Sequence, residues 1–201
     1  RKIGSPGLRN AVALVAAAFG VGLVVSMAMV YYTLPSVPAW NNWATLASFF
    51  STTILLGALA ISAAFVAGYS YLHRRGESET EKQREILAIT LRWMALIAIL
   101  ILGFQFIVLP LYMGYLAVSG PTAERSAEIL VIEHGLLFAT RLLLIFLGAG
   151  VFSLFIYVAA RSTQNLRLMS TLTVVAFVLV LAGELIGRYL FYASFARIGP
   201  L

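Results

Sequence analysis

A glutamate and an arginine stand inside an apolar run near the C-terminus, in "LAGELIGRYLFY" (181–192). Glu184 and Arg188 are spaced i, i+4, which places both on one face of a helix, with the acid N-terminal to the base in the favourable order. Tyr192 continues that face. Ionisable side chains are expensive in an apolar segment and mark functional candidates. These residues therefore predict either an ion pair that locks the helix in place or a polar site for a ligand.

The composition of the chain places these charges in a membrane. Of 201 residues, 61% are hydrophobic and 11% are charged, whereas a soluble domain has about 25% charged residues. The sequence has no cysteine, which excludes disulfides, cysteine-ligated iron–sulfur clusters and thiol catalysis within this chain. It also has no HExxH zinc motif and no glycine-rich phosphate loop. We therefore predict an integral membrane protein.

Five apolar segments are long enough to cross a membrane, since a helix needs about 20 apolar residues to span the hydrocarbon core. The sequence accordingly predicts an all-α, polytopic transmembrane helix bundle that forms a single domain over residues 1–201. The predicted spans are residues 8–30, 45–72, 86–116, 129–160 and 168–194.

Basic residues are distributed unequally between the two sides of this predicted bundle. Nine lie on the side of the N-terminus, and only Arg125 and Arg197 lie on the other side. Because Lys and Arg collect in cytoplasmic loops, we predict a cytoplasmic N-terminus and an outer C-terminus, with the loops 31–44 and 117–128 outside. The nine residues are Arg1, Lys2, Arg9, Arg74, Arg75, Lys82, Arg84, Arg161 and Arg167.

Several polar residues are predicted to share the outer half of the bundle. Arg141 and Arg188 each lie about 10 Å below the outer ends of consecutive antiparallel helices, given a rise of about 1.5 Å per residue, and Glu184 lies one turn deeper. Gln105 can add a hydrogen bond from the third span, which Pro110 is expected to interrupt or kink. Two cations and one anion leave net positive charge. The alternative to a structural ion pair is thus a pocket for an oxygen-bearing ligand or a partner's acid.

Small residues and a third arginine favour structural roles. Gly183 and Gly187 are four residues apart, which allows a neighbouring helix to approach closely. Arg92 lies near the cytoplasmic end of the third span, so its long side chain is expected to reach that interface.

The two histidines are predicted to lie at opposite sides of the membrane. His73 follows the second span and His134 begins the fourth, so the pair cannot ligate one haem iron within this chain. His134 is expected to cap or line the outer surface, with a role in proton handling as the alternative.

Two stretches of the sequence resemble the membrane anchor of dimethyl sulfoxide reductase. "LAGELIGRYLFYASFARIGPL" (181–201) is similar to the last helix of that family, with its Gly-Glu-Leu-Ile-Gly-Arg core and following Phe-Tyr pair. "VYYTLPSVPAWNNWATLASFF" (30–50) is similar to the family's outer loop, and Arg141 to an arginine early in its penultimate helix. The family anchor has eight helices. The resemblance implies that the five spans are its last five and that this chain is a fragment or departs from the pattern.

The resemblance also implies a function. Such anchors lie in the prokaryotic inner membrane, bind and oxidise menaquinol near the outer face without haem, and pass electrons to an iron–sulfur subunit that feeds a molybdopterin catalytic subunit. Glu184 would hold the arginines or release protons, and Trp40 would contact the iron–sulfur subunit or cover the quinol site. The alternatives are a polysulfide-reductase-type anchor, a purely structural anchor and, less favoured, a small transporter. The expected quinol-site residues are Glu184 as the catalytic candidate and Arg141, Arg188, Tyr192, Trp40, His134 and Gln105 for binding.

Overall fold

The computed structural model describes residues 6–74, 81–159 and 166–196, and all regular structure in these ranges is helical. Five of the described helices are long and apolar enough to cross a membrane. The prediction of an all-α, polytopic bundle is therefore confirmed. Most of the basic side chains used to predict its orientation lie outside the described part of the chain, namely those of Arg1, Lys2, Arg74, Arg75, Arg161, Arg167 and Arg197.

Four of the five spans are single helices close to their predicted ranges. They are α1 (Pro6–Tyr32), α2 (Trp43–Arg74), α3 (Glu81–Val118) and α7 (Leu166–Ala193). The third runs unbroken through Pro110, so the predicted interruption of this helix is wrong. Proline removes one backbone donor from a helix, and the hydrogen bonds on either side of that gap maintain the helical path.

The fourth span is built from several pieces and begins later than predicted. A short helix, α4 (Pro121–Glu128), continues into the π-helical turn η1 (Ile129–Glu133), and the membrane-crossing part begins only at Gly135 rather than at 129. The reason is His134, whose backbone leaves the helical region at φ −115° and ψ 21°. The span then consists of α5 (Gly135–Ile145), the π-helical segment η2 (Phe146–Phe152) and α6 (Ser153–Ala159).

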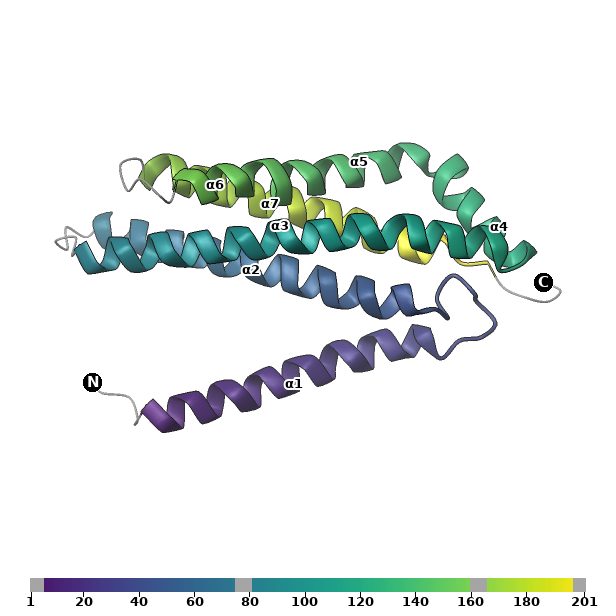
Figure 1. Ribbon diagram of the computed structural model, residues 1–201, viewed down its shortest axis with the longest axis horizontal. Coiled ribbons are helices and arrows are strands. Elements are labelled where there is room, and N and C mark those ends of the chain that lie inside the picture. The colour runs from purple at the N-terminus through teal and green to yellow at the C-terminus, as the bar shows by residue number, and fades with distance from the viewer. Residues whose placement is uncertain (1–5, 75–80, 160–165, 197–201) are drawn as a thin grey trace.

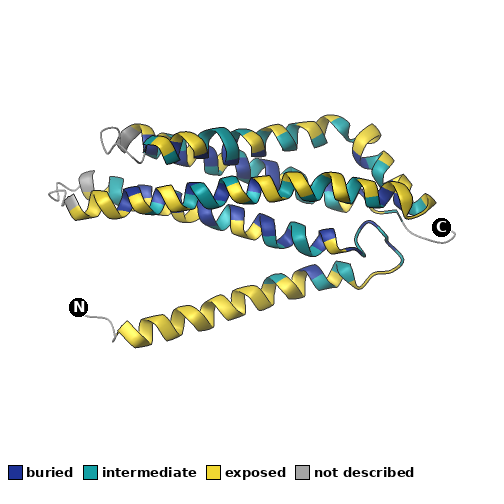
Figure 2. Ribbon diagram, in the orientation of Figure 1, coloured by how far each residue is buried: buried dark blue, intermediate teal, exposed yellow. Residues whose placement is uncertain are grey.

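The helices run roughly along one axis, and α1 separates from the others (Figure 1). One end of the bundle, here called the loop end, holds loop 33–42, α4, η1 and the last turn of α7. Of α1, only Ala28 is buried, and most of this helix is exposed (Figure 2). The apolar core lies among α2, α3, α5, α6, η2 and α7. Its largest buried members are Leu55, Leu59, Leu91, Ile145, Ile156, Met169 and Val180.

Loop 33–42 is held in place by its own polar side chains and by α7. The indole Nε1 of Trp40 donates to the carbonyl of Phe191 at 2.8 Å, and Thr45 Oγ1 donates to the carbonyl of Trp40 at 2.6 Å. Asn42 caps α2, since its side-chain oxygen accepts the backbone N–H of Ala44 at 2.9 Å. Its amide nitrogen also donates to the carbonyl of Ala39 at 2.7 Å. The loop therefore fixes where α2 starts relative to α7.

Replacing Asn42 with alanine should lower the free energy of unfolding by about 0.5–2 kcal/mol, because one N-cap hydrogen bond is lost. Chemical unfolding of the detergent-solubilised protein, followed by circular dichroism, measures the change. Ser26→Ala serves as the control, since Ser26 only bonds back to the carbonyl of Gly22 in its own helix. Equal stabilities of the two variants would contradict the capping role.

Candidate functional site

A buried carboxylate joins four helices near the loop end. Glu184 on α7 is only 3% exposed. Its Oε2 accepts a hydrogen bond from Thr52 Oγ1 on α2 at 2.8 Å, and its Oε1 accepts one from Gln105 Nε2 on α3 at 2.9 Å. Arg141 Nη2 on α5 lies 3.9 Å from Oε2. The predicted hydrogen bond from Gln105 is confirmed. Both oxygens of the carboxylate accept a hydrogen bond.

The ion pair of Glu184 differs from the one that the i, i+4 spacing predicted. Within the described residues the carboxylate pairs with Arg141, while the Arg188 guanidinium carbon lies 3.7 Å from the ring centroid of Phe49. The prediction of a Glu184–Arg188 pair is wrong. The donors on α2 and α3 hold the carboxylate toward the bundle interior, where α5 supplies the cation, and Arg188 stacks on an aromatic ring of α2 instead.

The two glycines of α7 allow Arg141 to reach this carboxylate. A Cβ atom on Gly187 would lie 2.5 Å from Arg141 Nε, and one on Gly183 would lie 2.7 Å from Ile145 Cγ1 and 3.3 Å from the Arg141 carbonyl oxygen. Real Cβ contacts are essentially never shorter than 3.0 Å, so a larger residue at either position would force the Arg141 or Ile145 side chain to move. The predicted close contact through a strip of small residues is confirmed.

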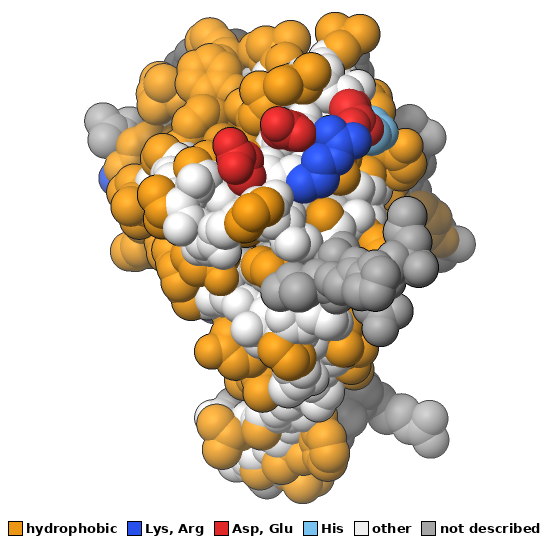
Figure 3. Space-filling model, turned by 90° about the vertical axis from the view of Figure 1, so that its right-hand side faces the viewer, with side chains coloured by type: hydrophobic (Ala, Val, Ile, Leu, Met, Phe, Trp, Pro, Cys, Tyr) orange, Lys and Arg blue, Asp and Glu red, His pale blue; other side chains and the backbone are white. Residues whose placement is uncertain are grey.

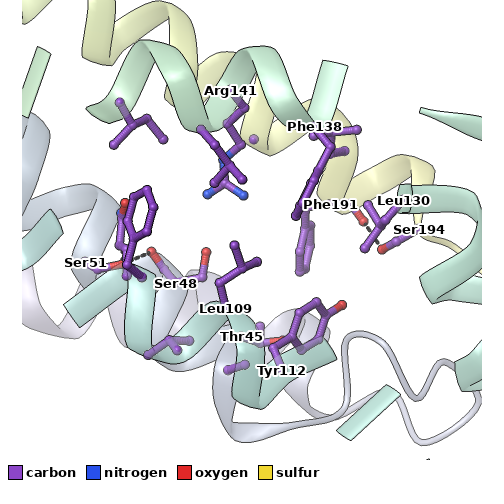
Figure 4. A pocket seen from close by; sticks show the side chains of 18 of the residues that line it. Thr45, Ser48, Ser51, Leu109, Tyr112, Leu130, Phe138, Arg141, Phe191 and Ser194 are labelled. Carbon is purple, nitrogen blue, oxygen red and sulfur yellow. Dashed lines mark hydrogen bonds between the residues drawn. The ribbon is translucent and has the colours of Figure 1, made fainter. Parts of the chain in front are cut away.

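A cavity of about 110 Å³ lies beside this cluster, toward the loop end. Arg141 extends into it from α5, facing hydroxyl-bearing side chains of α2 and the ring of Tyr112 on α3 (Figure 4). Apolar and aromatic side chains form most of the remaining wall. The polar lining residues are Thr45, Ser48, Ser51, Gln105, Tyr112, Arg141 and Ser194.

The Arg141 guanidinium is not satisfied by the protein. Its Nε is buried and has no hydrogen-bond partner, and its contact with Glu184 at 3.9 Å is an ion pair beyond hydrogen-bond distance. A buried donor without a partner costs about 1–3 kcal/mol. The Nε faces Gly187 of α7, where a Cβ atom would lie 2.5 Å away, so an oxygen atom of a ligand or a water would have to reach the Nη groups of Arg141 rather than this buried nitrogen.

Part of the cavity wall is exposed at the surface of the bundle. Phe106 on α3 lines the cavity and is 42% exposed, and Leu142 on α5 lines it and is half-buried. Both of these side chains are apolar.

Trp40 and Tyr192 lie behind the cavity wall rather than in it. The indole of Trp40 stacks on Phe191, with ring centroids 5.5 Å apart at 17°, and Phe191 lines the cavity. The Tyr192 hydroxyl lies 3.1 Å from that of Tyr31 on α1. Neither side chain, nor that of Arg188, is among the described lining residues.

His134 lies at the junction of η1 and α5. Its Nδ1 is 3.1 Å from the carbonyl oxygen of Ile129, and its Nε2 is 3.4 Å from the hydroxyl of Tyr189. The ring thus contacts the carbonyl oxygen of the residue that starts the π-helical turn. His73, its distant counterpart in the sequence, has a side chain outside the described part of the structure.

The face of the molecule at the loop end carries acidic side chains around one arginine (Figure 3). Arg125 contacts Glu128 at 3.0 Å and also pairs with Glu133. The hydrogen bond that Arg125 donates to Glu128, with the charge of Glu133, raises the pKa of Arg125 above its ordinary value. These groups are exposed to solvent, so the pairs add little stability, and they mark a polar surface above the apolar bundle.

The hydroxyl groups of α2 are the part of the site that the sequence prediction missed. Thr52 holds Glu184, and Thr45, Ser48 and Ser51 line the cavity. Residues 45, 48 and 52 recur at spacings of three and four within an apolar helix, which places them on one face. That stripe is the signal that could have identified α2 as a wall of the site. In the described ranges, no group of three or more His, Asp or Glu side chains is placed to hold a metal ion.

Comparison with known proteins places the protein in a family. The family described as "DMSO reductase anchor subunit (DmsC)" matches residues 2–194. Two of its relatives are subunits of anaerobic dimethyl sulfoxide reductases. The sequence is 29% identical over 199 residues to the subunit from Escherichia coli, and the match includes 97% of this chain and 60% of the relative. It is 29% identical over 185 residues to the subunit from Haemophilus influenzae, and that match includes 92% of this chain and 56% of the relative.

The chain thus spans less than two thirds of the length of these curated relatives. No solved structure matches it. The match nevertheless extends over nearly the whole chain and agrees with five helices that can cross a membrane. This multi-pass membrane protein belongs to the family of DMSO reductase anchor subunits.

Proposed function

We propose that this chain binds menaquinol in the loop-end cavity and serves as the haem-free, quinol-oxidising membrane anchor of a molybdopterin oxidoreductase complex. The observation that carries the proposal is the Arg141 guanidinium, which lines the cavity and lies 3.9 Å from Glu184, beyond hydrogen-bond distance. A quinol has oxygen atoms that can accept from a guanidinium and an apolar tail that remains in lipid. The family and both relatives, which are anaerobic dimethyl sulfoxide reductase subunits, support this choice of ligand.

Different cavity residues bind the quinol and orient the groups that bind it. When bound, menaquinol supplies two electrons and two protons. Arg141 donates a hydrogen bond to a ligand oxygen and, as a cation, favours the deprotonated form of that oxygen. Glu184 holds the guanidinium at the wall, and Gln105 donates to Glu184 while lining the cavity itself. At about 110 Å³, the cavity is below the roughly 300–1,000 Å³ of ordinary ligand pockets, so it holds the polar edge of the ring while the tail extends between the helices.

The position of the cavity near the loop end supports electron transfer to a subunit docked there. The positive-inside pattern supports an outer position for this end of the bundle in a prokaryotic inner membrane. Loop 33–42 with Trp40 and the acidic α4 surface form the exposed part of this end. In this proposal an iron–sulfur subunit contacts that surface and passes electrons to a molybdopterin catalytic subunit.

A purely structural anchor, or a polysulfide-reductase-type anchor, is the second candidate. It is favoured by the satisfied state of Glu184, whose oxygens both accept hydrogen bonds from neighbouring helices. A cluster of this kind stabilises helix packing without any ligand. The two candidates differ in what the removal of Arg141 does to quinol oxidation.

Replacing Arg141 with glutamine should weaken binding of a menaquinol analogue roughly tenfold, the loss expected for one charge-assisted hydrogen bond of about 1.5 kcal/mol. The measurement is oxidation of the analogue by membranes that contain the assembled complex. Arg92→Gln is the matched control, because Arg92 is also an arginine of a membrane helix but contacts Tyr157, 5.0 Å from its ring centroid. It should leave the rate unchanged.

Co-purification completes this experiment. Iron–sulfur and molybdopterin subunits should purify with both variants, since neither residue lies on the exposed loop-end surface. If Arg141→Gln oxidises the analogue like the parent protein, the structural anchor is the correct choice. A solitary chain without these partners would refute the proposed complex.

A further inference from the structure

Arg188 carries a charge that the described protein does not neutralise. Among the described residues its guanidinium makes no ion pair and no hydrogen bond, and it lies 3.7 Å from the ring centroid of Phe49. Glu184 is one turn away, but its two oxygens accept hydrogen bonds from α2 and α3, and its ion pair is with Arg141. Arg141 and Arg188 thus lie near a single carboxylate, and only Arg141 forms an ion pair with it. The N–H donors of Arg188 remain available for an acceptor from outside this cluster.

A second donor lies beside this guanidinium. The hydroxyl oxygens of Tyr31 on α1 and Tyr192 on α7 are 3.1 Å apart, so one hydroxyl donates to the other. The accepting hydroxyl still has its own proton to donate. Phe49 contacts both the tyrosine pair and the guanidinium, since its ring is 5.8 Å from that of Tyr31 and lies under Arg188. One cation and one hydroxyl donor therefore converge where α1, α2 and α7 meet.

The surroundings of this junction are apolar and exposed. Met27 and Val30 on α1 are 51% and 62% exposed, and Leu185 and Tyr189 on α7 are 63% and 54% exposed. In a membrane-spanning bundle such surface faces lipid. Tyr31 and Tyr192 stand in the last turns of their helices, at the level where aromatic residues collect beside lipid headgroups.

We propose that Arg188, with Phe49 and the Tyr31–Tyr192 hydroxyl pair, binds the phosphate group of an anionic phospholipid at the junction of α1, α2 and α7. A guanidinium donates two parallel hydrogen bonds to a phosphate and stacks on an aromatic face at the same time. The tyrosine hydroxyl supplies a third donor. The acyl chains lie along the exposed apolar surfaces of α1 and α7. This site is separate from the cavity, which Arg188 does not line.

The test measures lipid retention by the full chain. The protein is reconstituted into nanodiscs of phosphatidylglycerol and phosphatidylcholine, released into mild detergent, and weighed intact by native mass spectrometry. The parent protein should retain phosphatidylglycerol in preference to phosphatidylcholine. Arg188→Gln should lower the retained phosphatidylglycerol roughly tenfold, the loss of one charge-assisted contact. Arg92→Gln should retain it fully, and equal retention by Arg188→Gln and the parent would overturn the proposal.

A second measurement separates lipid from free phosphate. Inorganic phosphate is titrated into phosphatidylcholine nanodiscs while the thermal unfolding midpoint is followed. The proposal expects phosphatidylglycerol to raise the midpoint of the parent protein and inorganic phosphate to leave it unchanged. Stabilisation by inorganic phosphate to the same extent would show that the ligand is free phosphate and would overturn the lipid assignment.

If Arg188→Gln does not fold, a double variant is used in its place for the same measurement. Tyr31→Phe with Tyr192→Phe removes both hydroxyl groups and keeps the rings that pack on Trp40, Phe49 and Phe191. Its retention of phosphatidylglycerol should fall several-fold, and unchanged retention would overturn the proposal. No quinol is present in these measurements, so their outcome is independent of the proposed quinol oxidation.

Discussion

Replacing Glu184 with alanine is expected to lower the free energy of unfolding by about 3–5 kcal/mol, the loss typical when one partner of a buried charge pair is removed. The substitution removes the acceptor for Thr52 Oγ1 and Gln105 Nε2 and leaves the Arg141 charge without its carboxylate. Chemical unfolding of the detergent-solubilised protein, followed by circular dichroism, measures the loss. A change below about 1 kcal/mol would show that the cluster does not hold the four helices together.

The conservative variant Glu184→Gln distinguishes a role of Glu184 in positioning Arg141 from a role in proton transfer. Glutamine keeps the shape of the side chain and removes its charge, so the variant should lose stability by less than Glu184→Ala. If Glu184 only positions Arg141, oxidation of a menaquinol analogue should follow the amount of assembled complex. A proton-accepting role instead predicts a fall in the rate per complex at unchanged assembly. Glu128→Gln, at an exposed acid of α4, should change stability by less than about 0.5 kcal/mol.

Replacing Gly148 with alanine should cost about 3 kcal/mol, the upper part of the range for overpacking a core. The added Cβ would lie 2.7 Å from Val180 Cγ2 and 2.8 Å from the carbonyl oxygen of Ala176. The valine side chain is free to rotate away, but a backbone carbonyl moves only with its helix, so α7 must separate from η2. The unfolding free energy of the detergent-solubilised protein gives the cost.

Gly103→Ala is the matched control for this substitution. Gly103 lies in α3, and a Cβ there meets nothing within 4 Å. Alanine is favoured over glycine in a helix by about 0.5–1 kcal/mol, so this variant should be neutral or slightly more stable. If Gly148→Ala matches it, close packing of η2 on α7 is not what requires a glycine there.

The helical content and the number of spans were predictable because a membrane imposes a simple length rule. Each of the four simple spans begins and ends within five residues of its prediction, as α1 and α7 show. The fourth span was not predicted correctly, because a π-helical turn and a bend at His134 leave no mark in hydropathy.

The candidate site was predictable in its depth but not in its partners. Helical rise alone placed Glu184 one turn deeper than Arg141 on the neighbouring helix, and they do form a pair. The same rise placed Arg188 at the depth of Arg141, yet its guanidinium lies over the ring of Phe49 on α2 and makes no ion pair among the described residues. Helical spacing gives the height of a side chain and its angle about its own axis. It does not give the angle at which one helix presents its face to another.

The sequence by itself determined that this is a multi-spanning helical membrane protein with a signature in its last helix, because composition and local spacing report on single helices. Only the tertiary structure decided which guanidinium meets Glu184, because that depends on how α7 packs against α5. Gly183 and Gly187 allow that approach, and Thr52 and Gln105 turn the carboxylate toward it. Arg141 and Glu184 are 43 positions apart in the sequence. A contact between residues so far apart is set by helix packing, and no local sequence pattern predicts it.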